Sequence, residues 1–152
     1  MVWVARCSLD DIMSGRHIKP VNCILLRIFD TDYIEYPKAY YESSFKDIHT
    51  FKFLDLDTND PDPRIESISN AQARSIAKIL IDAKGSDTNI LVHCIMGISR
   101  SGGICEAAEA GLGYEYLHNG FLCPNILVKS KVLRFINILI KEEELRHDEI
   151  FN

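Results

Sequence analysis

The sequence lacks the features that mark several large classes of protein. It has no apolar run long enough to span a bilayer, and its first residues do not have the charged-then-apolar order of a signal peptide. It also has no internal repeats and no low-complexity segment. Its formal net charge of −5 argues against general binding to nucleic acid or to a membrane surface. We therefore expect a soluble, cytoplasmic protein that forms a single domain over residues 1–152.

Cysteines are few and irregularly spaced. There are five of them and no Cys-x-x-Cys pair, which argues against a zinc site and against a disulfide framework. They are Cys7, Cys23, Cys94, Cys105 and Cys123. A reducing compartment suits such a chain. The apolar share, 47% of all residues, is large enough for a hydrophobic core and too large for a disordered chain.

Predicted strands alternate with predicted helices along the chain. Apolar runs predict strands over residues 1–7, 21–29, 50–56 and 89–92. The polar, tyrosine-rich stretch between the second and third strands predicts a loop with a short helix. The alternation predicts an α/β fold, a single-domain sandwich with a central, mainly parallel sheet flanked by helices.

The helices have recognisable ends and faces. Ser8 and Ser69 each begin a capping pattern, and Gly15 and Gly85 are expected just beyond the ends of these two helices. Two more stripes of apolar residues recur at helical spacing in the C-terminal part of the chain, and we expect both to face the core. The first stripe is Ile104, Ala107, Ala108, Gly111 and Leu112, and the second is Val128, Val132, Phe135, Ile136 and Leu139.

The segment from residue 92 to residue 101 has the composition of an anion-binding loop. It has a His-Cys pair, then five residues, then an Arg-Ser pair, and it lies after an apolar strand and before a helical pattern. A loop between a strand and a helix N-terminus presents backbone N–H groups to an anion. Such groups would stabilise Cys94 as a thiolate, and Arg100 offers a planar guanidinium that matches two phosphate oxygens.

The other residues of this segment have supporting roles in the same interpretation. Gly97 permits backbone angles that turn several N–H groups inward. Ser101 can donate a hydrogen bond to the sulfur when it acts as a leaving group, and His93 would orient the nucleophile from a buried strand end. The residues expected to bind the phosphate are Ile95, Met96, Gly97, Ile98, Ser99 and Arg100.

This segment resembles the signature loop of the protein-tyrosine-phosphatase superfamily, and its Gly-x-Ser-Arg-Ser ending is most similar to the compact dual-specificity branch. The resemblance implies a phosphatase that hydrolyses phosphotyrosine, and in a shallow pocket also phosphoserine or phosphothreonine, through a phosphocysteine intermediate. It implies a phosphorylated protein or peptide as partner, and a mechanism that requires no metal or other cofactor. The Gly102–Gly103 pair departs from the pattern, because paired glycines weaken the first helical turn after the loop.

The general acid that protonates the leaving group is expected in the acidic stretch after the third strand. In the family that this chain resembles, the acid is an Asp after an apolar strand that often ends in Phe-x-Asp, and Asp55 fits that position best. It lies 39 positions before Cys94. Asp57 is the alternative, and Asp60 is a third candidate if the loop folds over the site.

The same stretch has a competing interpretation as a calcium-binding loop. Asp55, Asp57, Asn59 and Glu66 occupy positions one, three, five and twelve of such a loop. Position six is Asp60 where glycine is needed, and two prolines follow, so we favour the phosphatase interpretation.

The substrate class follows from the charge of the loop. It carries no lysine and no second arginine between Cys94 and Arg100. Relatives that act on inositol phospholipids tend to have extra basic residues there, so a singly phosphorylated substrate is expected. Two other functions stay open: a phosphatase-like module that binds phosphopeptides without hydrolysis, and an RNA 5′-triphosphatase, which would be expected to have a more basic surface.

Overall fold

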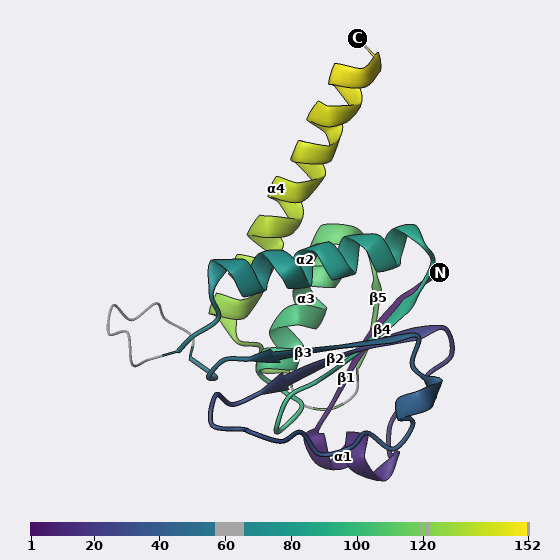
Figure 1. Ribbon diagram of the computed structural model, residues 1–152, viewed down its shortest axis with the longest axis vertical. Coiled ribbons are helices and arrows are strands. Elements are labelled where there is room, and N and C mark those ends of the chain that lie inside the picture. The colour runs from purple at the N-terminus through teal and green to yellow at the C-terminus, as the bar shows by residue number, and fades with distance from the viewer. Residues whose placement is uncertain (57–65, 119, 121, 152) are drawn as a thin grey trace.

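A parallel β-sheet forms the centre of the molecule (Figure 1). The computed structural model describes residues 1–56, 66–118, 120 and 122–151. Within these residues the sheet has five strands, in the order β3-β2-β4-β1-β5, and every neighbouring pair is parallel. The strands are β1 (Trp3–Cys7), β2 (Cys23–Phe29), β3 (Asp47–Lys52), β4 (Asn89–His93) and β5 (Glu115–Leu117). The predicted α/β sandwich with a mainly parallel sheet is therefore confirmed.

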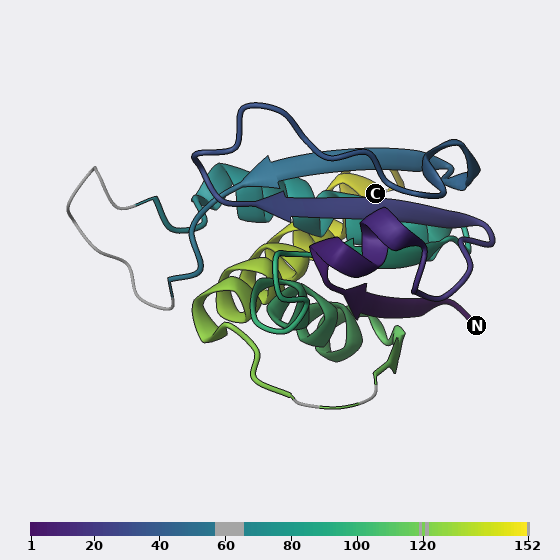
Figure 2. The same cartoon turned by 90° about the horizontal axis from the view of Figure 1, so that it is seen from below.

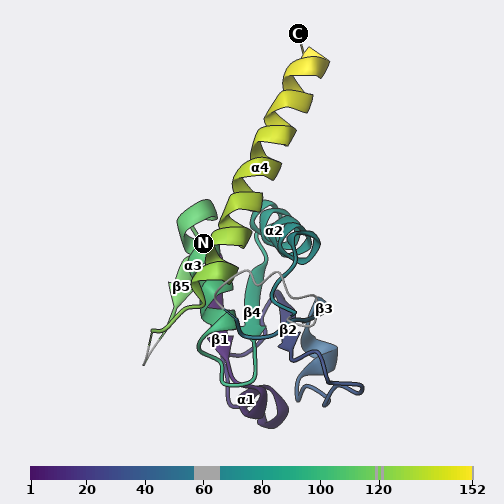
Figure 3. The same cartoon turned by 90° about the vertical axis from the view of Figure 1, so that its left-hand side faces the viewer.

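Helices cover both faces of this sheet (Figures 2 and 3). The short helix α1 (Leu9–Ser14) lies on one face, together with the segment that leads to the 3-10 turn η1 (Glu42–Ser44). The other face is covered by α2 (Asn70–Gly85), α3 (Arg100–Leu112) and α4 (Ile126–Phe151). The C-terminal half of α4 projects away from the body of the molecule (Figure 1). None of the helices in the described part of the chain is long and apolar enough to cross a membrane.

The two central strands, β2 and β4, contribute to a separate core on each face. Leu26 and Val92 pack toward α2, α3 and α4, whereas Leu25 and Leu91 pack toward α1. Strands covered on both faces need a nearly continuous run of apolar residues, which both β2 and β4 have. Both predicted C-terminal stripes also face the core. The buried residues are Ile104, Ala107 and Ala108 in the first stripe and Val128, Val132 and Ile136 in the second.

The helix ends match the sequence patterns. Ser8 accepts a hydrogen bond from the backbone N–H of Asp11, and Gly15 ends α1 in the left-handed conformation. Ser69 and Gln72 form a complete capping box at the start of α2. Gly85 is the last residue of α2 rather than the residue beyond it.

The third strand is displaced from its predicted position, residues 50–56. It begins at Asp47 and ends at Lys52. Because β3 lies at the sheet edge and is only partly buried, its apolar pattern is weak and gives a poor signal for its bounds. Phe53 still donates to the Phe29 carbonyl, but the N–H of Leu54 bonds to Glu66 outside the sheet. The short strand β5 was not predicted.

Candidate active site

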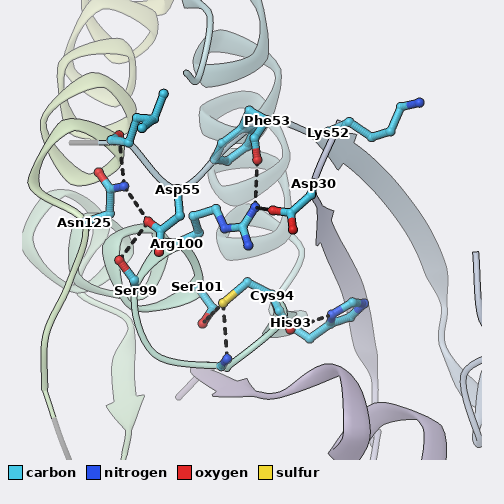
Figure 4. A network of polar contacts seen from close by, with 12 residues as sticks. Asp30, Lys52, Phe53, Asp55, His93, Cys94, Ser99, Arg100, Ser101 and Asn125 are labelled. Atoms are coloured by element: carbon cyan, nitrogen blue, oxygen red, sulfur yellow. Dashed lines mark hydrogen bonds and ion pairs between the residues drawn. The ribbon is translucent and has the colours of Figure 1, made fainter. Parts of the chain in front are cut away.

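Cys94 lies directly after β4, at the carboxyl edge of the sheet (Figure 4). This edge is where ligands bind in open α/β sheets. The thiol is 2% exposed. The backbone N–H of Gly97 lies 3.2 Å from Sγ and the Ser101 hydroxyl lies 3.3 Å from it. The loop between β4 and α3 therefore folds back over the sulfur and directs an amide toward it.

Three carbonyl oxygens of the loop accept hydrogen bonds from residues outside the loop. The Ile95 carbonyl accepts from the N–H of Leu9 at 3.1 Å, and the Gly97 carbonyl accepts from Arg6 Nη1 at 2.6 Å. The Ser99 carbonyl accepts from the N–H of Asn125 at 2.9 Å. Because these partners come from β1, α1 and the start of α4, the surrounding fold fixes the orientation of the loop peptides. Amides of such a loop are available to an anion.

Gly97 is required at its position in the loop. Its φ is +75°, which favours glycine, and it packs directly on the chain between β1 and α1. A Cβ atom at this position would lie 2.4 Å from the Cys7 carbonyl carbon and from the Ser8 nitrogen. No side chain fits there without displacing backbone.

Arg100 is the first residue of α3 and is 4% exposed. Its Nη1 donates to Asp30 Oδ1 and to the Phe53 carbonyl oxygen, each at 2.7 Å (Figure 4). Its Nε is buried and has no hydrogen-bond partner within the described residues. A buried donor without a partner is costly, so this edge of the guanidinium is suited to an oxyanion.

Asp55 lies at the exposed rim of the loop. Its Oδ1 accepts from Ser99 Oγ at 2.9 Å and from Asn125 Nδ2 at 2.8 Å. Asn125 is buried, and its Oδ1 accepts from the N–H of Val128 in the first turn of α4. Asp55 is thus hydrogen-bonded both to the loop and to the residue that directly precedes α4. The alternatives Asp57 and Asp60, and with them the calcium-loop interpretation, lie outside the described residues.

His93 is fully buried and directly precedes Cys94. Its Nε2 lies 3.0 Å from Arg27 Nε, and its Nδ1 lies 3.3 Å from the Cys94 carbonyl oxygen. Burial, reinforced by the charge of Arg27, lowers the pKa of His93 to about 3. The ring is therefore neutral at physiological pH and cannot serve as a cationic partner of the thiolate.

The other buried thiols are poor nucleophiles. Burial raises the pKa of Cys7 and of Cys23 to about 12, and raises that of Cys105 well above its usual range. Cys123 is exposed.

The glycine pair at the start of α3 has a packing explanation. A Cβ atom on Gly103 would lie 2.7 Å from the Asn125 carbonyl oxygen and 3.1 Å from Val128 Cβ. The close approach of α4 requires this glycine, and that approach places Asn125 beside the loop. Gly102 has more room, since the nearest atom to its Cβ position is 3.6 Å away.

The structure brings His93, Cys94, Arg100 and Ser101 together and places Asp55 at the rim of the same loop (Figure 4). Sequence reasoning missed the supporting residues Arg6, Arg27, Asp30 and Asn125. Asp30 had a usable signal, because it directly follows a buried parallel strand, as Cys94 does. The others had none, since their partners are distant in the sequence.

Comparison with known proteins supports the fold. No protein-family model matches the sequence, and neither does any curated protein. Among solved structures, human DUSP28 aligns with a TM-score of 0.52 and 15% identity, over 91% of this chain and 94% of that chain. The human tyrosine phosphatase-like serine/threonine/tyrosine-interacting protein aligns with a TM-score of 0.52 and 14% identity, over 78% of each chain. The chain therefore has a compact fold of the dual-specificity phosphatase type.

Proposed function

We propose that this protein is a cysteine-dependent phosphatase that hydrolyses phosphotyrosine, and in a shallow site also phosphoserine or phosphothreonine, in proteins or peptides. One observation carries the proposal: a buried thiol begins the loop between β4 and α3, and the loop leads directly to a buried guanidinium whose Nε has no hydrogen-bond partner within the described residues. A thiol supplies a nucleophile for phosphorus, and the guanidinium Nε is suited to the oxygens around it. The fold shared with DUSP28 agrees with this function.

The first chemical step transfers the phosphoryl group to sulfur. The Cys94 thiolate forms a bond to phosphorus while the bond from phosphorus to the substrate oxygen breaks. Arg100 and the loop amides hold the three non-bridging oxygens as charge builds on them. Asp30 and the Phe53 carbonyl fix Nη1, which leaves Nε to face the phosphate.

The leaving oxygen requires a proton, and Asp55 is the proposed donor. In the second step a water attacks the phosphocysteine, the same carboxylate accepts its proton, and inorganic phosphate and the thiolate are released. The Ser101 hydroxyl, 3.3 Å from the sulfur, stabilises the thiolate as it leaves. Hydrogen bonds from Ser99 and Asn125 support this role because they hold Asp55 at the edge of the loop.

The central test is turnover of p-nitrophenyl phosphate and of a phosphotyrosine peptide. We expect the wild-type protein to release phosphate from both without added metal, and Cys94→Ser to abolish release while still binding the peptide. Cys123→Ser is the matched control, since that thiol is exposed and distant in sequence from the loop, and it should retain full activity. Peptide binding without turnover by the wild-type protein would instead favour a binding module.

A second test concerns the identity of the general acid. Nitrophenolate leaves readily without a proton, whereas the tyrosine phenolate needs one. Asp55→Asn should therefore lower kcat for the phosphotyrosine peptide by about 100-fold and for p-nitrophenyl phosphate far less. Asp32→Asn, at an exposed position, is the control. Equal losses on both substrates would show that Asp55 is not the general acid, and Asp57→Asn and Asp60→Asn would then be tested in the same way.

A further inference from the structure

Arg27 is a buried cation in the middle of the sheet. It lies on β2, directly opposite His93 of β4 in the strand register, and is 4% exposed. Its guanidinium carbon lies 5.0 Å from the centre of the Phe29 ring, and its Nη2 donates to the Pro37 carbonyl. A charge in this position is expensive unless it is compensated.

No carboxylate of the described residues lies within ion-pair distance of Arg27. Burial lowers the pKa of Arg27, and the charge of Glu42, from η1, opposes this shift. Arg27 in turn lowers the pKa of His93. Arg100, the other buried arginine described, is by contrast paired with Asp30 at 2.7 Å. Arg27 is therefore a buried positive charge whose nearest functional neighbour is the loop that carries the nucleophile.

The contact with His93 determines where the imidazole proton lies. A guanidinium N–H is always a donor, so His93 Nε2 must accept the bond from Arg27 Nε. The neutral ring then carries its proton on Nδ1, which lies 3.3 Å from the Cys94 carbonyl oxygen and donates to it. Arg27, His93 and the Cys94 peptide thus form a directed chain of hydrogen bonds.

We propose that Arg27 is a positioning residue of the active site. It holds His93 in the Nδ1–H tautomer, and through His93 it holds the Cys94 peptide. Its buried charge favours the anionic sulfur and the bound phosphoryl group. The proposal rests on the proposed function. Ser101 from α3 lies 3.3 Å from the Cys94 sulfur, and the thiols of Cys7 and Cys105 interact electrostatically with that sulfur. Arg100 acts on His93, and Arg6 from β1 acts on Cys105.

The first experiment measures the wild-type tautomer and needs no variant. Nitrogen-15 chemical shifts of the His93 ring distinguish Nδ1–H from Nε2–H. We expect the Nδ1–H tautomer between pH 6 and pH 8, and observation of the Nε2–H tautomer would overturn the proposal whether or not the protein is active.

The second experiment measures the charge effect by titrating Cys94 through the pH dependence of its alkylation rate by iodoacetamide. Arg27→Met should shift this pH dependence toward higher pH, so that the alkylation rate at pH 7 falls about tenfold, and Arg27→Lys, which keeps the charge, should have a smaller effect. Arg16→Met is the control, because Arg16 is exposed and forms its ion pair, among the described residues, with Asp11. It should leave the titration unchanged.

A second neutral variant, Arg27→Gln, keeps the test valid if Arg27→Met does not fold. It removes the charge and keeps a donor. A folded neutral variant with an unchanged Cys94 titration would overturn the electrostatic part. Absence of phosphate release by the wild type would contradict the proposed function, whereas these titrations report on Arg27 independently of turnover.

Discussion

The back of the loop between β4 and α3 and its front rim are held by different kinds of contact. The back consists of buried groups: His93 and Arg27 behind Cys94, and Gly97 packed on the backbone of Cys7. The front rim consists of Asp30, Asp55 and Ser99, whose side chains are partly or largely exposed. Changes at the back should therefore cost folding stability, while changes at the rim should alter turnover and leave the fold intact.

The largest effect is expected for Gly97→Ala at the back. The new methyl group would meet backbone at 2.4 Å in a conformation with positive φ. We expect a loss of at least about 4 kcal/mol of the free energy of unfolding, and loss of activity in any protein that folds. Urea denaturation measures the first quantity.

Gly113→Ala is the matched control for this change. Gly113 has nearly the same φ, +73°, but no atom lies within 4 Å of its Cβ position. It should therefore show only the strain of the left-handed conformation, about 1 kcal/mol. Equal losses in the two variants would mean that the contact with Cys7 contributes nothing.

The next effect is acid destabilisation through His93, also at the back. Its pKa is about 3 in the folded protein and 6.5 as a free side chain, so the unfolded chain binds the proton more readily between these values. Stability from this group is fully present above pH 6.5 and is lost as the pH falls toward 3. The loss is on the order of 4 kcal/mol.

Denaturation midpoints measured from pH 7.5 to pH 4 check this expectation. His93→Asn should flatten the dependence, and His147→Asn, at an exposed position of α4, should not. If the wild type and His93→Asn lose stability in parallel, a different group must cause the acid sensitivity.

A smaller effect, confined to turnover, is expected at the rim for Asp30→Ala. Without the carboxylate, Arg100 keeps only the Phe53 carbonyl as a partner of Nη1 and is less well oriented. We expect kcat/KM to fall about tenfold, or about 1.4 kcal/mol of transition-state stabilisation. Stability should fall by only about 1 kcal/mol, because Asp30 is 39% exposed and water can take its place beside Arg100. Asp32→Ala should change neither quantity. A large loss of folding stability in Asp30→Ala would contradict the distinction between rim and back.

The back and the rim also differ in how far they could be predicted from the sequence. The strand, loop and helix around Cys94 are local, and Gly97, Ser101 and Arg100 were assigned their positions from spacing alone. The parallel sheet followed from apolar runs and capping patterns. These features leave a pattern within short segments of the chain, even where the contacts that they make are distant.

The missed features depend on contacts between distant residues. Arg27 reads as a lone charge in an apolar strand, and only the β2–β4 register places it on His93, 66 positions away. Asp30 and Asn125 reach the site from elements that are each 70 positions from their partners. Edge strand β3 was misplaced because its half-exposed residues carry a weak pattern. Sequence spacing thus predicts the residues of the candidate site better than the distant residues that hold them.

The smallest effect is expected for Ser99→Ala, which separates positioning at the rim from folding. Ser99 Oγ donates to Asp55 at 2.9 Å, but Asn125 Nδ2 donates to the same oxygen at 2.8 Å and is buried. Loss of the serine hydroxyl leaves Asp55 held by Asn125, so kcat for the phosphotyrosine peptide should fall only about threefold, with stability changed by less than about 1 kcal/mol. In an Asn125→Ala background the same substitution should cost more, because both donors that the described residues supply to Asp55 are then lost. Steady-state rates of the two single variants and the double variant measure this coupling, and strictly additive losses would show that Ser99 and Asn125 do not share the positioning of Asp55.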